Sequence, residues 1–279
     1  MKVVVTGGSG LTGYHVVEDL FEHGYQVSIV DRVRPKNDLA PYRFVDLEDL
    51  GQAIGALGGA DAVVHLAAIP RPIYDTNEVV FRTNVMTTFN VLEAATILGI
   101  QKVIYASSIS VIGYPFFYRY FAPAYVPINE DHPRLPQDPY AMSKYMGEEI
   151  ASSFVRRGGI NIISLRLAWV HTPESFKAQL MPMWDDPAAG ATNLWWYVDG
   201  RDAAQAFRLA LESDLEGHHA FFIGASDSFM KIPSQQLVRE YYPEAEVRLE
   251  LSGTTAMVSS RKAEKMLGYK ANYTWQTYF

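Results

Sequence analysis

The sequence predicts an α/β protein with a doubly wound parallel sheet and a small C-terminal subdomain. Short apolar segments, such as residues 3–5 and 27–30, alternate with longer segments of helical character through the first two thirds of the 279 residues. This alternation is typical of right-handed βαβ units, whose strands are buried on both faces. The length suffices for one large domain or two small ones.

Each predicted element follows from a run of apolar residues and the residues that end it. Gly24 and Gly99 stand where the first two helices should stop. The predicted strands are residues 3–5, 27–30, 44–45, 62–66, 102–106 and 161–165, and the predicted helices are 11–22, 85–98, 140–155, 202–211, 234–241 and 260–267. After about residue 170 the alternation weakens, so we expect a first domain at 1–170 and an interleaved substrate-side subdomain at 171–279.

Composition excludes several classes of protein and site. The net charge of −7 argues against a general nucleic-acid binder. The absence of cysteine excludes thiolate nucleophiles and Cys-based zinc sites, and the seven histidines form no HExxH pattern, so no metal is expected. No apolar run approaches the roughly 18 residues of a membrane span, and the first residues do not form a signal peptide. We therefore expect a soluble cytoplasmic protein with no membrane partner.

The segment from Gly7 to Gly13, GGSGLTG, separates the first strand from the first helix. In a phosphate-binding turn, Gly7 would permit the tight turn, Gly10 would let a pyrophosphate approach the backbone, and Gly13 would let the helix pack against the sheet. The helix N-terminus would attract the anion. The segment predicts a Rossmann-type dinucleotide site, and the alternative is a glycine-rich turn without a ligand.

The second strand ends at an acid that strengthens this interpretation. Asp31 lies 18 residues after Gly13, near the offset expected for a residue that binds the adenosine ribose. A carboxylate there would accept hydrogen bonds from the ribose hydroxyls and repel a 2′-phosphate, which favours NAD. Arg32 and Arg34 stand beside it and partly offset the repulsion, so NADP stays open.

A tyrosine and a lysine open the helix at 140–155. Tyr140 and Lys144 are four residues apart and share a helix face. A nearby ammonium lowers the pKa of a phenol, and Ser108, which follows the fifth strand, would hydrogen-bond the same substrate oxygen. Together these groups would remove a proton from a carbinol while hydride leaves to a nicotinamide.

As an ordered set, these and other motifs resemble the NAD-dependent epimerase/dehydratase family, the extended short-chain dehydrogenases/reductases. The matching segments are TGGSGLTG at 6–13, Asp31, Asp46-Leu47, HLAA at 65–68, TNVMTTFNVLEAA at 83–95, YASSISVIG at 105–113, YAMSK at 140–144, LRLAWVHTP at 165–173 and VSSRKAEKMLGYKANYTW at 258–275. The similarity covers nearly the whole chain.

The resemblance implies roles for the matching residues. Tyr140 would be the general acid/base, Lys144 would bind ribose and tune Tyr140, and Ser108 would polarise the substrate, with Ser107 the less suitable serine. The implied cofactor residues are Gly7, Gly10, Leu11, Thr12 and Gly13 at the turn, Asp31 and Arg32, Asp46 and Leu47 at adenine, Leu66, Ala67 and Ala68 toward the nicotinamide ribose, and Asn84.

Two tryptophans depart from the pattern of enzymes that act on nucleotide sugars. Trp169 stands where the family often has a substrate-binding asparagine, and Trp195 where it often has an arginine. An indole does not pair with a phosphate as a guanidinium does. Both residues are therefore predicted to pack against a smaller sugar-like substrate, and the alternative is core packing. Arg201 is expected to pair with Asp199 or Asp202.

The predicted activity is hydride transfer at a carbinol carbon of a sugar or sugar acid, with NAD as cofactor. The alternatives are an NAD-dependent nucleotide-sugar epimerase and a non-catalytic NAD(P)-binding sensor. The loop at 114–125 has seven aromatic residues and is interpreted as a lid, a subunit contact or a packed surface loop. The resemblance also implies a homodimer formed through the helices near 85–98 and 140–155.

Overall fold

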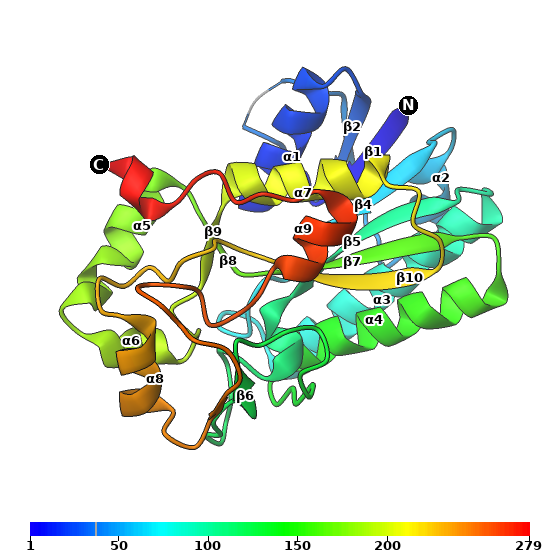
Figure 1. Cartoon of the computed structure of the whole chain (residues 1–279). Helices are drawn as coiled ribbons and strands as arrows, with labels where there is room; N and C mark the ends of the chain where they lie inside the picture. The colour runs from blue at the N-terminus through cyan, green and yellow to red at the C-terminus, as the bar shows by residue number, and fades with distance from the viewer. Residues whose placement is uncertain (37) are drawn as a thin grey trace.

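A parallel sheet covered by helices on both faces forms the centre of the computed structural model, which describes residues 1–36 and 38–279 (Figure 1). Within these residues the sheet has seven strands, and every neighbouring pair is parallel. In spatial order they are β10 (His218–Ile223), β7 (Asn161–Leu167), β5 (Lys102–Ser108), β4 (Ala62–His65), β1 (Lys2–Thr6), β2 (Gln26–Asp31) and β3 (Tyr42–Phe44). The predicted Rossmann-type fold is confirmed.

Successive residues of the central strands enter two different cores. In β1, Val3 and Val5 pack into one core and Val4 into the other, because side chains alternate across a sheet. Helices α1 (Leu11–Glu22) and α7 (Gly200–Glu212) cover the first face, and α2 (Leu50–Leu57), α3 (Asn77–Ile97) and α4 (Pro139–Arg157) cover the second. This is why the strands read as continuous apolar runs.

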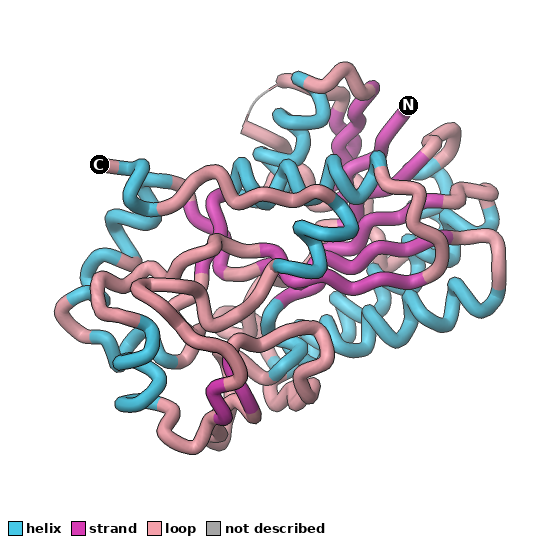
Figure 2. Tube along the Cα trace, in the orientation of Figure 1, coloured by secondary structure: helices cyan, strands magenta, loops and turns pink. Residues whose placement is uncertain are grey.

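The part of the chain outside the central sheet and its covering helices contains short elements joined by long loops, as Figure 2 shows. Two small parallel pairs, β6 with β11 and β8 with β9, lie outside the central sheet. The elements here are β6 (Tyr125–Val126), β8 (Trp169–His171), α5 (Pro173–Gln179), α6 (Pro187–Ala191), β9 (Tyr197–Asp199), α8 (Ser234–Tyr241), β11 (Glu246–Val247) and α9 (Arg261–Leu267), with short 3-10 turns η1 (Ile109–Ile112), η2 (Met181–Trp184) and η3 (Trp275–Tyr278).

The predicted boundary at residue 170 does not separate the sheet from the rest of the chain. β10 returns to the central sheet and pairs with β7 from His218↔Ile162 to Ile223↔Leu167. Helix α7 packs beside α1 on the sheet's first face. The chain therefore leaves the sheet after β7, forms the short elements β8, α5, α6 and β9, and returns at β10, so the two predicted parts are interleaved.

One helix begins well before its predicted start, and another is not predicted at all, each for an identifiable reason. Helix α3 begins at Asn77 and not near Val85, because the buried face of its first half carries Thr83, Asn84 and Thr87 in place of apolar residues. Helix α2 escapes detection because Gly51 and Gly55 interrupt its pattern, although Asp49 caps it by accepting a 2.9 Å hydrogen bond from the amide of Gln52.

No helix among the described residues is both long enough and apolar enough to cross a membrane. This finding concerns the helices of residues 1–36 and 38–279 only.

Candidate active site

The glycine turn lies between β1 and α1, and its three glycines meet different surroundings. Gly7 has a φ of +72°, and a Cβ on it would lie 2.5 Å from the amide nitrogen of Ala67. A Cβ on Gly13 would overlap the carbonyl oxygen of Gly7, so that glycine lets α1 pack against the turn. A Cβ on Gly10 would meet only that same oxygen, at 3.4 Å, so the space above Gly10 is open.

The N-terminus of α1 suits an anionic ligand. Gly10 caps the helix without a side-chain hydrogen bond, and the first turn contains no acid. The first amides of the helix, which include those of Leu11 and Thr12, therefore have no partner within the helix. An open approach at Gly10 together with uncapped amides fits the pyrophosphate of a dinucleotide.

Asp31 ties the glycine turn to the loop after β2. Its carboxylate accepts hydrogen bonds from the amides of Ser9, at 3.0 Å, and Val33, at 3.1 Å. These bonds hold the carboxylate next to the turn where the pyrophosphate would lie, which is the position that a ribose-binding acid requires.

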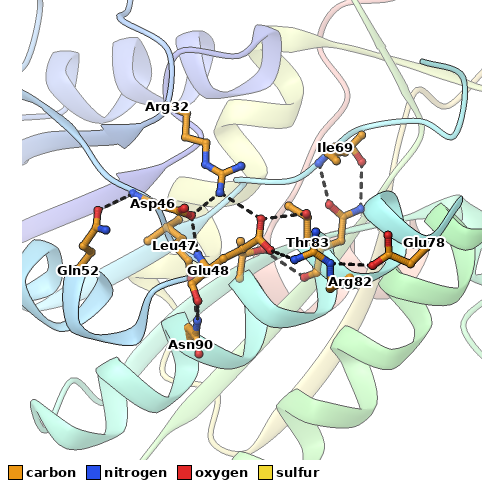
Figure 3. A network of polar contacts seen from close by, with 12 residues as sticks. Arg32, Asp46, Leu47, Glu48, Gln52, Ile69, Glu78, Arg82, Thr83 and Asn90 are labelled. Carbon is orange, nitrogen blue, oxygen red and sulfur yellow. Dashed lines mark hydrogen bonds and ion pairs between the residues drawn. The ribbon is translucent and has the colours of Figure 1, made fainter. Parts of the chain in front are cut away.

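Arg32, the residue after Asp31, belongs with Asp46 to a network of charges (Figure 3). The Arg32 guanidinium donates to Asp46, which follows β3, and lies 3.1 Å from Glu48. Burial acts to raise the pKa of the Asp46 carboxyl, but the hydrogen bond from Arg32 and that from the Glu48 amide outweigh it and lower this pKa. Leu47 is buried between the two acids. Sequence reasoning missed Glu48, although it follows Asp46-Leu47 directly.

The segment after β4 lies at the same carboxyl end of the sheet as the glycine turn. Leu66, Ala67 and Ala68 are half-buried there. Asn84 holds the segment in place, because its side chain accepts from the amide of Ile69 at 2.7 Å and donates to the carbonyl of Ile69 at 3.0 Å.

The amide of Asn84 also donates to the Ser143 hydroxyl at 3.1 Å, and its side chain is 2 % exposed. The structure therefore gives Asn84 a positioning role between the loop after β4 and helix α4. The sequence prediction placed it beside the cofactor.

Ser108, Tyr140 and Lys144 come together where β5 ends and α4 begins. Asp138 caps α4 by accepting a 3.0 Å hydrogen bond from the Ala141 amide, which sets Tyr140 in the first turn. The Lys144 ammonium donates to the carbonyl of Ala106 at 2.8 Å and lies 5.8 Å from the centre of the Tyr140 ring. Ser108, whose hydroxyl lies 2.9 Å from that of Ser110, stands beside the Tyr140 phenol.

Burial dominates the acid–base state of this pair. It raises the pKa of Tyr140 to about 12, against the hydrogen bond with Ser108, which lowers it. Burial also lowers the pKa of Lys144 to about 7. The expectation that Lys144 depresses the pKa of Tyr140 is therefore not met in this structure. The ammonium is directed at a backbone carbonyl, and its own charged form is disfavoured.

Ser107, which precedes Ser108, has a structural role. Ser107 donates to Glu148 at 2.7 Å, and Glu148 accepts two hydrogen bonds from Arg166, at 2.9 and 2.8 Å. This buried group joins β5, α4 and β7. Since Ser107 is committed to it, Ser108 is the serine that lies beside Tyr140.

The two predicted substrate tryptophans have different surroundings. Trp169 is 39 % exposed, and its ring centre lies 4.5 Å from that of His171. Trp195 is fully buried, its indole nitrogen donates to the Pro187 carbonyl at 2.8 Å, and its ring fills the space that a side chain at Gly190 would need. The prediction that Trp195 contacts the substrate is wrong, because this indole packs in the core.

The aromatic loop at 114–125 reaches Tyr140. Phe116 presents its ring edge-on to Tyr140, with 6.5 Å between the ring centres. The Tyr118 hydroxyl accepts a 3.2 Å hydrogen bond from Asn77 at the start of α3. Gln137, just before α4, accepts from the amides of Tyr118 and Arg119 at 3.1 and 2.8 Å. The loop is thus pinned to α3 and to the approach to α4, over Tyr140.

Comparisons with known proteins identify the family and several related enzymes. The model of the NAD dependent epimerase/dehydratase family matches residues 3–224. A UDP-glucose 4-epimerase of Corynebacterium glutamicum is 29% identical over 98% of this chain and 92% of its own length. An L-arabinose 1-dehydrogenase (NAD(P)(+)) of Haloferax volcanii is 28% identical over 77% of this chain and 84% of its own.

The fold also matches a solved structure with a dinucleotide. A short-chain dehydrogenase/reductase superfamily protein from Agrobacterium tumefaciens, with bound NAD, superposes with a TM-score of 0.76 at 22% identity, covering 100% of this chain and 94% of that one. At this identity the likeness supports the fold alone.

Proposed function

Because the chain belongs to the NAD-dependent epimerase/dehydratase family, we propose that it is a dehydrogenase that oxidises a carbinol carbon of a small sugar or sugar acid. The observation that carries the proposal is the grouping of Ser108, Tyr140 and Lys144 at the carboxyl end of the sheet, where the glycine turn also lies. In α/β sheets, ligands bind at the carboxyl ends of the strands.

The residues of this site divide the reaction between them. NAD, when bound, accepts the hydride from the carbinol carbon. Tyr140 takes the hydroxyl proton, so that the carbinol becomes a carbonyl group. Ser108 donates a hydrogen bond to the reacting oxygen, and Lys144, held by the Ala106 carbonyl, keeps a positive charge beside the phenol when protonated. In the reverse direction, Tyr140 returns the proton.

Two aromatic residues support a small polyol as substrate. Trp169 is partly exposed beside His171, and Phe116 covers the approach to Tyr140. Flat aromatic faces pack well on the C–H faces of sugars. Arg201, the cation nearest in sequence to Trp195, is bound by Asp199 at 2.9 and 2.8 Å and stacks on Tyr273, so it is committed within the protein.

The second candidate is an NAD-dependent nucleotide-sugar epimerase, which is favoured by the relative from Corynebacterium glutamicum that aligns over nearly the whole chain. The same Ser108, Tyr140 and Lys144 would serve it, but the reduced cofactor would stay bound. A non-catalytic sensor is disfavoured, because Tyr140 and Lys144 are both present and lie together at the start of α4.

The decisive experiment is to measure NADH release with NAD across free aldoses, uronic acids and UDP-sugars. A dehydrogenase releases NADH on a free sugar or sugar acid. Tyr140→Phe should lower this turnover by roughly 10³-fold, the scale of acid–base catalysis. Interconversion of a UDP-sugar without net NADH would identify an epimerase instead. Binding of NADH with no turnover of any substrate would favour the sensor.

We also propose that the protein works as a cytoplasmic homodimer. The outer side of α3 and α4 carries Phe81, Phe89, Met142 and Met146, each between 36 and 40 % exposed. Such apolar exposure on adjacent helices suits a contact with a second copy. Light scattering should give a dimer mass for the wild-type protein and a monomer for Met146→Glu, and a wild-type monomer would contradict the proposal.

A further inference from the structure

Two arginines and three acids form a cluster that joins the loop after β2, the loop after β3 and helix α3 (Figure 3). Glu48 lies at its centre, with only 20 % of its side chain exposed. Its carboxylate accepts from Arg32 at 3.1 Å, from Arg82 at 3.0 Å and from the hydroxyl of Thr83 at 3.0 Å. We call the group Arg32, Asp46, Glu48, Glu78 and Arg82 the Glu48 cluster.

The backbone of this segment is held as firmly as its side chains. The side-chain amide of Asn90 donates to the backbone carbonyls of Leu47 and Glu48, both at 2.9 Å. Asp46 accepts from the Glu48 amide at 2.9 Å, and its own amide donates to Gln52 at 2.9 Å. Glu48 is therefore preorganised to hold the two arginines, which come from the loop after β2 and from α3.

The position of Arg32 matters for the choice of dinucleotide. Asp31 is held at the glycine turn, where an acid binds the ribose, and Arg32 is the next residue. In related folds an arginine near this acid accommodates the 2′-phosphate of NADP. The sequence alone leaves that role open for Arg32 or Arg34.

The ion pairs of Arg32 argue against its binding the 2′-phosphate of NADP. Its guanidinium is bound by Asp46 and Glu48, and Arg82 is bound by Glu48 and by Glu78 at 2.8 Å. Asp31, whose carboxylate accepts only from backbone amides among the described residues, adds a fourth acid beside these two arginines, so the group carries net negative charge. A 2′-phosphate, with a further charge of about −2 at neutral pH, would be repelled.

We propose that Glu48 is a specificity-determining residue that makes the site reject NADP, by holding Arg32 and Arg82 in ion pairs. The proposal rests on the NAD-dependent function of the chain and names the form of dinucleotide that the site accepts. The test measures dinucleotide binding and not turnover. A protein that binds NADH but turns over no substrate would contradict the proposed function and leave the role of Glu48 unaffected.

The test measures the Kd values of NADH and NADPH by the change in their own fluorescence on binding, without substrate. Glu48→Gln keeps the shape of the side chain and removes its charge. We expect the ratio of the NADPH Kd to the NADH Kd to fall by about tenfold, as one charge near a 2′-phosphate is lost and Arg32 keeps a single acidic partner, Asp46, so that it can turn toward the phosphate. The matched control is Glu78→Gln, which also borders Arg82 but does not touch Arg32, and its ratio should change by less than about threefold.

Second substitutions show whether the released cation is Arg32. Adding Arg32→Gln to Glu48→Gln should abolish the gain in NADPH affinity. Adding Arg34→Gln should leave it, because Arg34 lies apart from the cluster, 3.6 Å from Asp38. A gain that survives the loss of Arg32 would contradict the proposal.

The wild-type protein offers a test that needs no variant. Salt screens the repulsion of the 2′-phosphate, whereas the pyrophosphate contribution cancels in the ratio. The ratio of the NADPH Kd to the NADH Kd should therefore fall several-fold between low and high ionic strength. Equal wild-type affinity for the two dinucleotides, or a ratio that stays constant with both salt and Glu48→Gln, would overturn the proposal.

Discussion

Glycines leave space free of a side chain in two regions of this molecule. In one region the space is open, and in the other it is filled by tryptophan rings of the chain itself. At the turn after β1, Gly10 leaves open space beside uncapped helix amides. On the substrate side, Gly190 and Gly224 stand where a Cβ would overlap the rings of Trp195 and Trp196, so the space is already filled by the chain's own indoles. The difference teaches that a glycine next to an open helix end indicates a ligand, whereas a glycine under an aromatic ring indicates packing.

The largest expected effect lies on the packed side. Trp195→Ala should lower the free energy of unfolding by about 3–5 kcal/mol, since it removes a fully buried indole and leaves a cavity. Trp169→Ala should lower it by about 1 kcal/mol or less, because that indole is partly exposed. Denaturant unfolding gives both values.

The same two variants separate stability from binding. Trp169→Ala should raise KM for the sugar-like substrate, whereas Trp195→Ala, if assayed while folded, should change KM little. If the two tryptophans have equal effects on unfolding, then the contrast between packed and exposed indoles is wrong.

Alanine in the glycine turn should affect stability at Gly13 and cofactor binding at Gly10. Gly13→Ala places a methyl group against the Gly7 carbonyl and should cost about 2–3 kcal/mol of stability. Gly10→Ala should keep the fold, since its Cβ meets one atom at 3.4 Å, but weaken NADH binding by roughly tenfold. Thermal unfolding and NADH titration measure the two effects, and unchanged NADH affinity in Gly10→Ala would contradict the assignment of the turn.

The pH dependence of turnover follows from the raised pKa of Tyr140, about 12. Oxidation needs the phenolate, so its kcat/KM should rise by up to about tenfold per pH unit above neutrality, whereas reduction, which needs the phenol, should stay level. Ser108→Ala should shift the oxidation profile to higher pH, because it removes the hydrogen bond that lowers this pKa. An oxidation rate that is flat from acid to alkaline pH would show that Tyr140 does not act as the base.

The smallest expected effect concerns the aromatic loop. Phe116→Leu should raise KM by about two- to fivefold, because it removes the ring that lies edge-on to Tyr140. Phe117→Leu is the matched control, since Phe117 packs on Tyr114, Tyr120 and Phe121 and should leave KM unchanged. Similar changes in both variants would mean that the loop acts on the substrate only through its overall packing.

Short-range sequence patterns predicted much of the fold and the cofactor-binding part of the site. The alternation of apolar strands and helices predicted the parallel sheet, and the spacing of Gly7, Gly10 and Gly13 placed the turn at the start of α1. These patterns are local because a strand, a turn and a helix end are each specified by neighbouring residues. Tyr140 and Lys144, four residues apart in one helix, are local in the same sense.

Tertiary packing decided what the local patterns left open. Whether Trp195 faces a substrate or the core depends on Gly190 and Pro187, and whether Arg32 faces a phosphate depends on Asp46 and Glu48. The return of β10 to β7, and the pKa of Tyr140, also depend on segments distant in the chain. The sequence by itself determined the family, the fold and the groups available for chemistry, because those follow from residue type and short spacing. Burial and charge pairing of each group were decided only by the tertiary structure, because they depend on which distant side chains lie within a few ångströms.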